Sequence, residues 1–310
     1  MYFDFFGMKH APFELTPDID CLFLSKQHTK AMVYMDYATW NAGGFVVITG
    51  EIGSGKTTLV KWLLSKSKNK NQCFHVEFTN LTGNDFFIYL LKQVGVSYKE
   101  QDKISLVYAL HEYLKKSSRN GRPCLLVIDE AQNLTADQLE DIRMLAALEG
   151  TDGPLLRIIL LGQPELINTI QSTEQFKQRV KLHYHLKGLS IEDLEKYIEF
   201  RMEKSGYEGE KLFNGPLISE IFRHSNGIPR LINKICDGLL ICAYADDRYI
   251  LDPKDLESIL VDLMIATESN KPQPQNVVKT GAIRYGVLLE RLAVAIENLN
   301  ENIALIAGKK

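Results

Sequence analysis

The chain has 310 residues, enough for one large domain or two modest ones, and 45% of them are hydrophobic, which is ample for a folded core. Its net charge of −3 excludes a protein that binds nucleic acid through a surface that is basic throughout, although local basic patches remain open. No stretch of about 18 residues is free of charge, and the N-terminus does not have the pattern of a secretory signal. We therefore expect no membrane span and a cytoplasmic protein.

An α/β fold is predicted for the first part of the chain, where short apolar runs alternate with helical patterns. Residues 1–30 form an aromatic leader, and a helix is expected over 27–40. Strands are then predicted at 45–50, 73–78, 124–129, 156–162 and 181–186, and helices at 56–67, 83–94, 103–118 and 135–149. Almost wholly apolar runs are typical of parallel strands that are covered on both faces. The alternation predicts a parallel sheet in a domain spanning 1–187, which includes the leader.

Only helices are predicted in the second part of the chain. They are expected at 190–205, 215–225, 229–245 and 253–265, which together predict a small all-α domain over 188–265. A linker containing proline and glutamine is placed at 266–282. The last segment, 283–310, has apolar residues at steps of three and four and is predicted to form an amphipathic helix. That helix packs either on its own α-helical domain or on a partner.

The strongest chemical signal is a glycine-rich motif, Gly50-Glu-Ile-Gly-Ser-Gly-Lys-Thr57, between a predicted strand and a predicted helix. Glycines let the backbone wrap a phosphate, and the following helix directs its positive end at the anion. Lys56 supplies a point charge for the β- and γ-phosphates, and the Thr57 hydroxyl suits Mg²⁺. The motif predicts an ATP site formed by Gly50, Gly53, Ser54, Gly55, Lys56, Thr57 and Thr58.

A second signal is the acidic pair Asp129-Glu130, which ends the apolar run Leu125-Leu-Val-Ile. Carboxylates at the carboxyl ends of parallel strands lie on the sheet edge where α/β proteins bind ligands. Asp129 suits the Mg²⁺ shell, and Glu130 suits the base that orients and deprotonates the attacking water. Together with the phosphate loop, the pair predicts hydrolysis of ATP, with Lys56 and Glu130 as catalytic residues.

Polar residues near later strands are candidates for completing this site. Gln163 directly follows a strand, where it either senses the γ-phosphate or caps the next helix. Phosphoryl transfer gains from an added positive charge at the γ-phosphate. Arg179, just before the fifth strand, is a candidate for reaching a neighbouring subunit's nucleotide, and Arg230 for closing over the nucleotide of its own subunit. The alternative for both is a plain surface arginine, and Arg143 and Arg157 are weaker competitors.

Two clusters of basic residues fall in predicted helix-to-strand connections. Their members are Lys66, Lys68, Lys70, Lys115, Lys116, Arg119 and Arg122. In a parallel sheet such connections share the edge opposite the ATP site, so these charges gather on one face if the two following strands are neighbours. Such a face suits the backbone of duplex DNA. The alternative is a set of solvated loop residues.

Several motifs occur in an order that resembles one known family. They are Asp129-Glu-Ala-Gln-Asn-Leu134, Leu139-Glu-Asp-Ile-Arg143, Gly162-Gln-Pro-Glu-Leu166, Gln178-Arg179 and Gly227-Ile-Pro-Arg-Leu-Ile-Asn233, preceded by Phe5-Phe-Gly7 and Pro12-Phe13. Together they resemble the ExeA-type ATPases, the general-secretion-pathway protein A group of AAA+ proteins, over about residues 1–265.

The resemblance implies a five-stranded AAA+ core with an α-helical lid, and ATP hydrolysis coupled to self-assembly into a ring or filament. It also implies that Arg179 acts as a catalytic arginine finger on a neighbouring subunit and that Arg230 is a lid sensor. The segment around Pro12, Phe13, Phe23 and Leu24 is implied to line the adenine pocket.

The chain departs from the secretion members of this group after residue 265, because those members continue into a membrane span and envelope domains. Related AAA+ proteins without such an anchor assemble on duplex DNA with ATP and engage a transposase or targeting protein. We therefore expect a DNA-binding regulator that recruits a transposition or recombination partner. The alternative is an ATPase scaffold or motor for envelope secretion.

Overall fold

The structure, a computed structural model, describes residues 1–15, 22–67, 70–77, 81, 83–151 and 153–263. The chain divides into two compact units, Met1–Asp255 and Leu256–Lys310. The predicted linker, the predicted C-terminal helix and Lys68 lie outside the described residues. Within the described ranges, no helix combines the length and apolar character that crossing a membrane requires.

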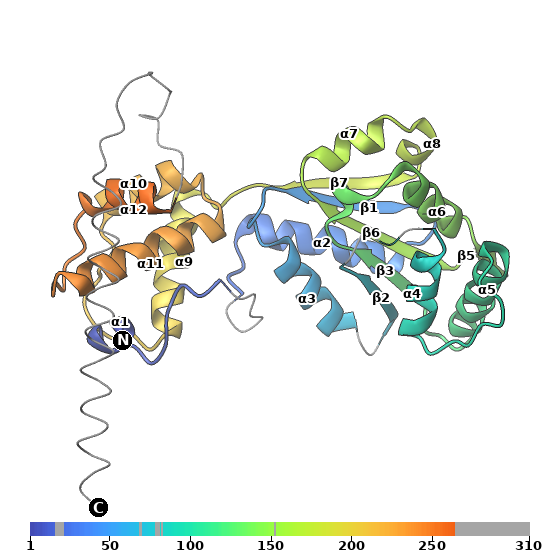
Figure 1. The fold of residues 1–310 in the computed structure, drawn as a ribbon, viewed down its shortest axis with the longest axis horizontal. Coiled ribbons are helices and arrows are strands. Elements are labelled where there is room, and N and C mark those ends of the chain that lie inside the picture. The colour runs from blue at the N-terminus through green and yellow to red at the C-terminus, as the bar shows by residue number, and fades with distance from the viewer. Residues whose placement is uncertain (16–21, 68–69, 78–80, 82, 152, 264–310) are drawn as a thin grey trace, which may run out of the picture. The chain divides into compact units, whose positions relative to one another are not determined.

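A parallel sheet of five strands forms the centre of the first part of the chain, as predicted (Figure 1). Its strands are β1 (Phe45–Gly50), β2 (Gln72–Val76), β3 (Cys124–Ile128), β6 (Leu156–Gly162) and β7 (Val180–Leu186). They lie in the order β2-β3-β6-β1-β7, and every neighbouring pair is parallel. The carboxyl ends of β3, β6 and β1 therefore meet at one edge, which we call the carboxyl edge; the opposite edge is the amino edge.

Helices cover both faces of this sheet, which explains why the strands are almost continuously apolar. On one face, Val46 and Ile48 pack with α2 (Lys26–Trp40) and α3 (Lys56–Ser67). On the other face, Phe45 and Val47 share a core with side chains of five helices, the last of which is short and precedes β7. These are α4 (Asp85–Gln93), α5 (Lys103–Arg119), α6 (Ala136–Ala146), α7 (Glu165–Gln171) and α8 (Glu174–Lys177). Each fully buried aliphatic side chain contributes roughly 1.5–3 kcal/mol to folding.

The connection between α6 and β6 differs from the prediction. The helix expected over 135–149 ends at Ala146, and a two-stranded antiparallel hairpin follows, formed by β4 (Glu149–Gly150) and β5 (Gly153–Pro154). Gly153 has φ of +109°, which favours glycine, and Pro154 cannot donate a helical hydrogen bond. These residues therefore favour the hairpin, whereas the helix was predicted to continue to 149 because Leu148 keeps the apolar spacing.

Three helices follow β7 before the first unit ends, α9 (Ile191–Lys204), α10 (Gly215–Ser225) and α11 (Pro229–Ala245), and α12 spans Asp255–Asp262. Their starts carry local signals. The Ser190 hydroxyl accepts a hydrogen bond from the Asp193 N–H, and the Asn214 side chain accepts one from the Leu217 N–H. Proline occupies the first turn of both α10 and α11, where it is tolerated because no intrahelical donor is needed.

The aromatic leader packs on these later helices. Its short helix α1 (Tyr2–Phe5) lies beside α11, where the Tyr2 hydroxyl donates to the Asp237 carboxylate (Figure 1). The Lys9 N–H donates to the Ser205 carbonyl at 2.8 Å, at the end of α9. Residues 2–14 of the leader thus contact the part of the chain between 188 and 255, although the sequence grouped the whole leader with the sheet. The division at residue 187 stays a prediction.

Candidate active site

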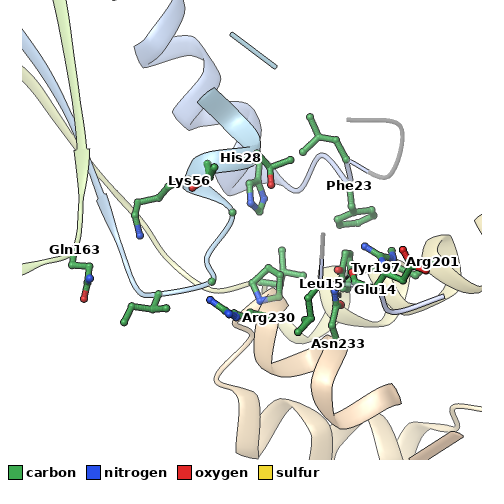
Figure 2. A pocket seen from close by; sticks show the side chains of 18 of the residues that line it. Glu14, Leu15, Phe23, His28, Lys56, Gln163, Tyr197, Arg201, Arg230 and Asn233 are labelled. Carbon is green, nitrogen blue, oxygen red and sulfur yellow. Dashed lines mark hydrogen bonds between the residues drawn. The ribbon is translucent and has the colours of Figure 1, made fainter. Parts of the chain in front are cut away.

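A cavity of about 380 Å³ opens where the carboxyl edge of the sheet meets α9, α11 and the leader. Most of the predicted nucleotide-binding residues line it, together with the predicted base Glu130: Gly53, Gly55, Lys56, Thr57, Thr58, Gln163 and Arg230. In Figure 2, Lys56 and Gln163 lie on one side of the cavity, and Phe23 and Tyr197 lie on the other. The cavity therefore has a charged, polar end and an aromatic end, and its size is within the range of small-molecule sites.

The phosphate loop follows β1, and its conformation explains its glycines. Gly53 and Gly55 have φ of +82° and +100°, in the left-handed region that side chains disfavour. A Cβ on Gly53 would lie 2.3 Å from the Cβ of Arg230, and a Cβ on Gly55 would lie 2.8 Å from Nε2 of His28. Both glycines are thus required by the close approach of other residues as well as by backbone conformation.

Lys56 is the first residue of α3 and is buried in the loop. Its Nζ donates to the Gly50 carbonyl at 2.7 Å and to the Glu51 carbonyl at 3.0 Å. Burial lowers the pKa of this ammonium from its ordinary value, and the negative charges of Glu130 and Asp129 oppose that shift. A further negative group at this end of the cavity would favour the charged form of Lys56 still more, so the site is suited to an anion.

Thr57 and Asp129, the two predicted magnesium ligands, lie in contact. The Thr57 hydroxyl donates to Oδ2 of Asp129 at 2.9 Å, and Oδ1 accepts from the Glu130 N–H at 2.9 Å. Burial raises the pKa of the Asp129 carboxyl, and the hydrogen bond from Thr57 opposes the shift. A hydroxyl and a carboxylate that converge on one point form the oxygen donor set that Mg²⁺ prefers. The residues present therefore fit a magnesium ion.

Glu130 is held in an unusual backbone conformation. Its φ of 51° places it in the left-handed region, which costs of order 1–3 kcal/mol for a residue other than glycine. Its carboxylate accepts a hydrogen bond from Nε2 of Gln132 at 2.7 Å, and Oε1 of Gln132 accepts from the N–H of Gln163 at 2.9 Å. One side chain therefore joins two strand ends. Gln132 belongs to the motif that follows Asp129, but the sequence alone gave it no role.

The aromatic end of the cavity is formed by the leader and by α9. Leu15, Leu22, Phe23 and Tyr197 line it, and the rings of Phe23 and Tyr197 meet edge to face with centroids 5.7 Å apart. Of the four leader residues implied to line an adenine pocket, only Phe23 lines this cavity. Pro12 and Phe13 are buried elsewhere, with Phe13 against Phe213, and Leu24 is exposed.

His28 is a site residue that the sequence did not reveal. Its Nε2 lies 3.1 Å from the Ser54 carbonyl in the phosphate loop, and its Nδ1 lies 2.7 Å from the Ser25 hydroxyl, which caps α2. Burial lowers the pKa of the imidazole, so the neutral form is favoured. In that form Nε2–H donates to Ser54 and Nδ1 accepts from Ser25. His28 thereby fastens the phosphate loop to α2 and lines the middle of the cavity (Figure 2).

The four candidate arginines occupy different places. Arg230, near the start of α11, lines the cavity, and its backbone N–H donates to the Gly53 carbonyl at 3.2 Å. Arg179 precedes β7, and its carbonyl accepts from the N–H of Phe45 at the start of β1. The five steps from Phe45 to Gly50 along β1, at about 3.3 Å each, separate that position from the phosphate loop by about 16 Å. Arg143, paired with Glu140, and Arg157 do not line the cavity.

Comparisons with known proteins agree with this geometry. Residues 40–170 match the family described as AAA domain. The chain is 34% identical over 248 residues to general secretion pathway protein A of Aeromonas hydrophila, an alignment that covers 79% of this chain and 45% of that protein. The chain therefore spans less than half the length of this relative.

Solved structures share the fold at low sequence identity. Cdc6p of Pyrobaculum aerophilum matches with a TM-score of 0.64 and 13% identity, over 83% of this chain and 72% of that chain. ORC1 of Aeropyrum pernix, solved in complex with DNA, matches with a TM-score of 0.58 and 12% identity, over 82% and 69%. ORC2 of the same organism, solved with ADPNP and ADP, also has a TM-score of 0.58, at 16% identity over 82% and 72%.

Fold and site together define a P-loop protein with an AAA+ fold, and the sheet order and the phosphate loop confirm the predicted fold class. The predicted resemblance to the ExeA-type AAA+ ATPases is confirmed by the shared family and by the identity to general secretion pathway protein A. The AAA domain match and the fold support the predicted enzyme class, an ATP hydrolase. The individual roles of the site residues stay predictions.

Proposed function

We propose that the cavity binds ATP with its triphosphate at the charged end and its base at the aromatic end. Lys56 and the N–H groups of the phosphate loop hold the phosphates, and Arg230 closes over them from α11. Thr57 and Asp129 hold Mg²⁺, which when bound neutralises charge that develops on the phosphates. Glu130 accepts a proton from the attacking water, and Gln132 keeps its carboxylate directed toward Gln163. The observation that carries this proposal is the contact between Thr57 and Asp129, next to Glu130.

We further propose that a second copy of the chain completes the site with Arg179. This arginine lies at the amino edge, too far from its own phosphate loop for its side chain to span the distance. An arginine supplied by a neighbour stabilises charge at the γ-phosphate, and this contribution is typically worth about 10³–10⁵ in turnover. Hydrolysis would then depend on assembly of subunits into a ring or filament.

Mixing two inactive variants tests both proposals. Glu130→Gln keeps Arg179 but lacks the base, and Arg179→Ala keeps the base but lacks the finger. Each alone should lose ATP turnover by at least about a hundredfold while still binding ATP. An equimolar mixture should recover up to about a quarter of wild-type turnover, because about one interface in four joins an intact Glu130 to an intact Arg179. A mixture as inactive as its components would contradict completion in trans.

We propose duplex DNA as the ligand that the assembled subunits bind, because basic residues gather at the amino edge. β2 and β3 are neighbours, so the connections that precede them lie side by side. Lys70, Lys116, Arg119 and Arg122 form no ion pair with another described residue. By contrast, Lys66 pairs with Asp36 at 3.0 Å, and Lys115 pairs with Glu112 at 3.0 Å.

Unpaired cations along one edge attract the phosphate backbone of DNA. The DNA releases counterions when these cations bind, which makes the affinity sensitive to salt. Charge-reversed Lys116→Glu and Arg122→Glu should therefore weaken duplex binding at fixed salt without changing ATP binding. Electron microscopy with ATP and duplex DNA should show filaments or rings that these variants fail to form. Wild-type protein that does not bind duplex DNA even at low salt would contradict the proposed DNA-binding function. The ATPase proposal would still stand.

A second candidate function is an ATPase that drives or scaffolds envelope secretion. The observation that favours it is the identity to general secretion pathway protein A across 79% of this chain. The two candidates share the nucleotide site and differ in their target. Duplex DNA that stimulates ATP turnover supports the first candidate, and a transposase or targeting protein is then the expected partner. Turnover that responds only to components of a secretion system supports the second.

A further inference from the structure

A second hollow, of about 470 Å³, lies at the amino edge and is separate from the nucleotide cavity. One wall is the C-terminal half of α5, and the other is the β4–β5 hairpin. His111 on α5 lies 3.1 Å from the Glu149 carbonyl and joins the two walls. Pro123 and Leu155, which directly precede β3 and β6, also line the hollow. It is therefore framed by secondary structure on both sides.

Basic side chains dominate the lining. Lys115, Arg119 and Arg157 line the hollow, and Glu149 is the one acidic residue among its described lining residues. Lys115 is partly neutralised by Glu112 at 3.0 Å. Neither Arg119 nor Arg157 forms an ion pair with a described residue. The hollow thus has positive charge that the described residues do not neutralise.

Arg157 is the residue that distinguishes this hollow from a set of solvated surface cations. It is the second residue of β6, where its backbone pairs with Leu125 of β3. Its Nε atom is buried and has no hydrogen-bond partner among the described residues. Burial lowers the pKa of its guanidinium, which means that the surroundings disfavour the charge. Arg157 nevertheless lines the hollow, so an anion there would meet a guanidinium whose charge no described residue neutralises.

Helix electrostatics account for the other two cations but not for Arg157. Lys115 and Arg119 lie near the C-terminal end of α5, where positive side chains stabilise the negative end of the helix. Arg157 lies in a strand, which has no comparable dipole. A planar guanidinium presents several donors and matches the geometry of a phosphate oxygen pair. Its placement beside Arg119 therefore points to recognition of a phosphate group.

We propose that this hollow is a phosphate-binding subsite that holds one backbone phosphate of duplex DNA between Arg157 and Arg119. The proposal rests on the DNA-binding function proposed above and adds Arg157, which the sequence considered only as a competitor for the ATP site. An extended polyanion is favoured over a compact ligand because free basic residues continue beyond the hollow. Lys116 and Arg122, like Arg119, lie where α5 leads into β3, and Lys70 lies just before β2, the strand that pairs with β3.

The test compares Arg157→Gln with Arg223→Gln, a matched control. Arg223 lies on α10 and pairs with Glu220, so the control removes the same charge far along the chain from the hollow. Fluorescence anisotropy with a labelled duplex, ATP and increasing salt gives both affinity and the number of phosphate contacts. Arg157→Gln should weaken binding roughly tenfold and reduce the slope of log K against log salt by about 1. Arg157→Lys should keep the slope and recover only part of the affinity.

Thermal denaturation and ATP binding check that every variant is folded. Equal effects of Arg157→Gln and Arg223→Gln, in a wild-type protein that binds duplex, would overturn the subsite and leave the DNA-binding function intact. Wild-type protein that binds no duplex at low salt would overturn the function and the subsite together. A loss of slope at Arg157 and none at Arg223 supports both.

Discussion

At the scale of single residues, the site is organised by side chains that join one strand end to another. Gln132 contacts the Glu130 carboxylate with its amide nitrogen and the Gln163 backbone with its amide oxygen. A residue in this position determines where the carboxylate points without touching substrate. Glu130 needs such support because its own backbone is in the left-handed region, which is disfavoured for its side chain.

Replacing Gln132 with Ala should therefore lower kcat for ATP about tenfold or more, because a hydrogen bond to a charged group is worth roughly 1.5–3 kcal/mol. KM for ATP should change little, since Gln132 does not line the cavity. Steady-state kinetics measure both quantities. Asn133→Ala, one residue further along the same turn and exposed, is the matched control. A change confined to KM would refute the positioning role.

His28 makes the stability of the protein depend on pH. Burial lowers the pKa of its imidazole below the ordinary value of 6.5 in the folded state. Below that pH the unfolded chain takes up a proton that the folded chain resists, so the free energy of unfolding falls as the pH falls. Above that pH the imidazole is neutral in both the folded and the unfolded state, so His28 no longer makes the free energy of unfolding depend on pH.

His28→Gln should reduce this loss of stability between pH 7.5 and pH 5, because the amide does not titrate. Urea unfolding at the two pH values measures the difference for wild type and variant. His10→Gln, at an exposed position in the leader, is the control. Identical pH dependence in wild type and His28→Gln would show that this imidazole is not held neutral.

At the scale of elements, hydrogen bonds from α9 and α11 hold the leader, and a buried guanidinium on α9 makes two of them. Arg201 on α9 donates from Nε to the Pro12 carbonyl at 2.6 Å and from Nη2 to the Glu14 carbonyl at 3.0 Å. Asn233 on α11 reaches the same Glu14 carbonyl at 3.4 Å. Because Glu14 and Leu15 line the nucleotide cavity, these bonds connect two helices to the aromatic end of the site.

Arg201→Met keeps the apolar stem of the side chain and removes its donors. The Pro12 carbonyl then loses its described partner, and we expect a loss of roughly 2–3 kcal/mol in stability. Hydrogen exchange should show faster exchange in residues 1–15, with weaker ATP binding. Lys204→Met, on the exposed side of the same helix, is the control. Unchanged exchange in the leader would contradict the anchoring role.

At the scale of the whole molecule, the two edges of the sheet carry different chemistry. The carboxyl edge carries the phosphate loop, Asp129 and Glu130, whereas Arg179 and the basic connections lie at the amino edge. If Arg179 of one copy serves the nucleotide of another, activity becomes a property of the assembly. Nucleotide binding and subunit association then stabilise each other through mass action.

ATP turnover per subunit should consequently rise with protein concentration until assembly is complete. Arg179→Ala should show low turnover at every concentration, because its interfaces lack the finger. Arg230→Ala changes a residue that lines the cavity of its own chain, so it should lower turnover and keep the concentration dependence. Wild-type turnover per subunit that is constant across concentrations at which subunits dissociate would contradict the shared site.

Local patterns in the sequence were sufficient to predict the elements of the fold and the chemistry of the phosphate loop. The helix predicted at 229–245 and the strand predicted at 156–162 match α11 and β6 residue for residue, because apolar periodicity and helix-start signals act within a few residues. The hairpin formed by β4 and β5 was missed because Leu148 continues the helical spacing of apolar residues, and strands of two residues are too short to show an alternating pattern.

The contacts that the sequence did not predict depend on which distant segments of the chain meet in the fold. His28 reaches Ser54, and Gln132 reaches Gln163, only because parallel strands bring their carboxyl ends to one edge. The leader is hydrogen-bonded to α9 and α11 through residues that lie 187 or more positions further along the chain. Arg157 and Arg119 line one hollow because β3, which follows α5, pairs with β6. The sequence by itself predicted a nucleotide site and its phosphate loop, since the residues for phosphate binding are contiguous. Tertiary structure alone decided which side chains position them, because those contacts join residues that no local pattern connects.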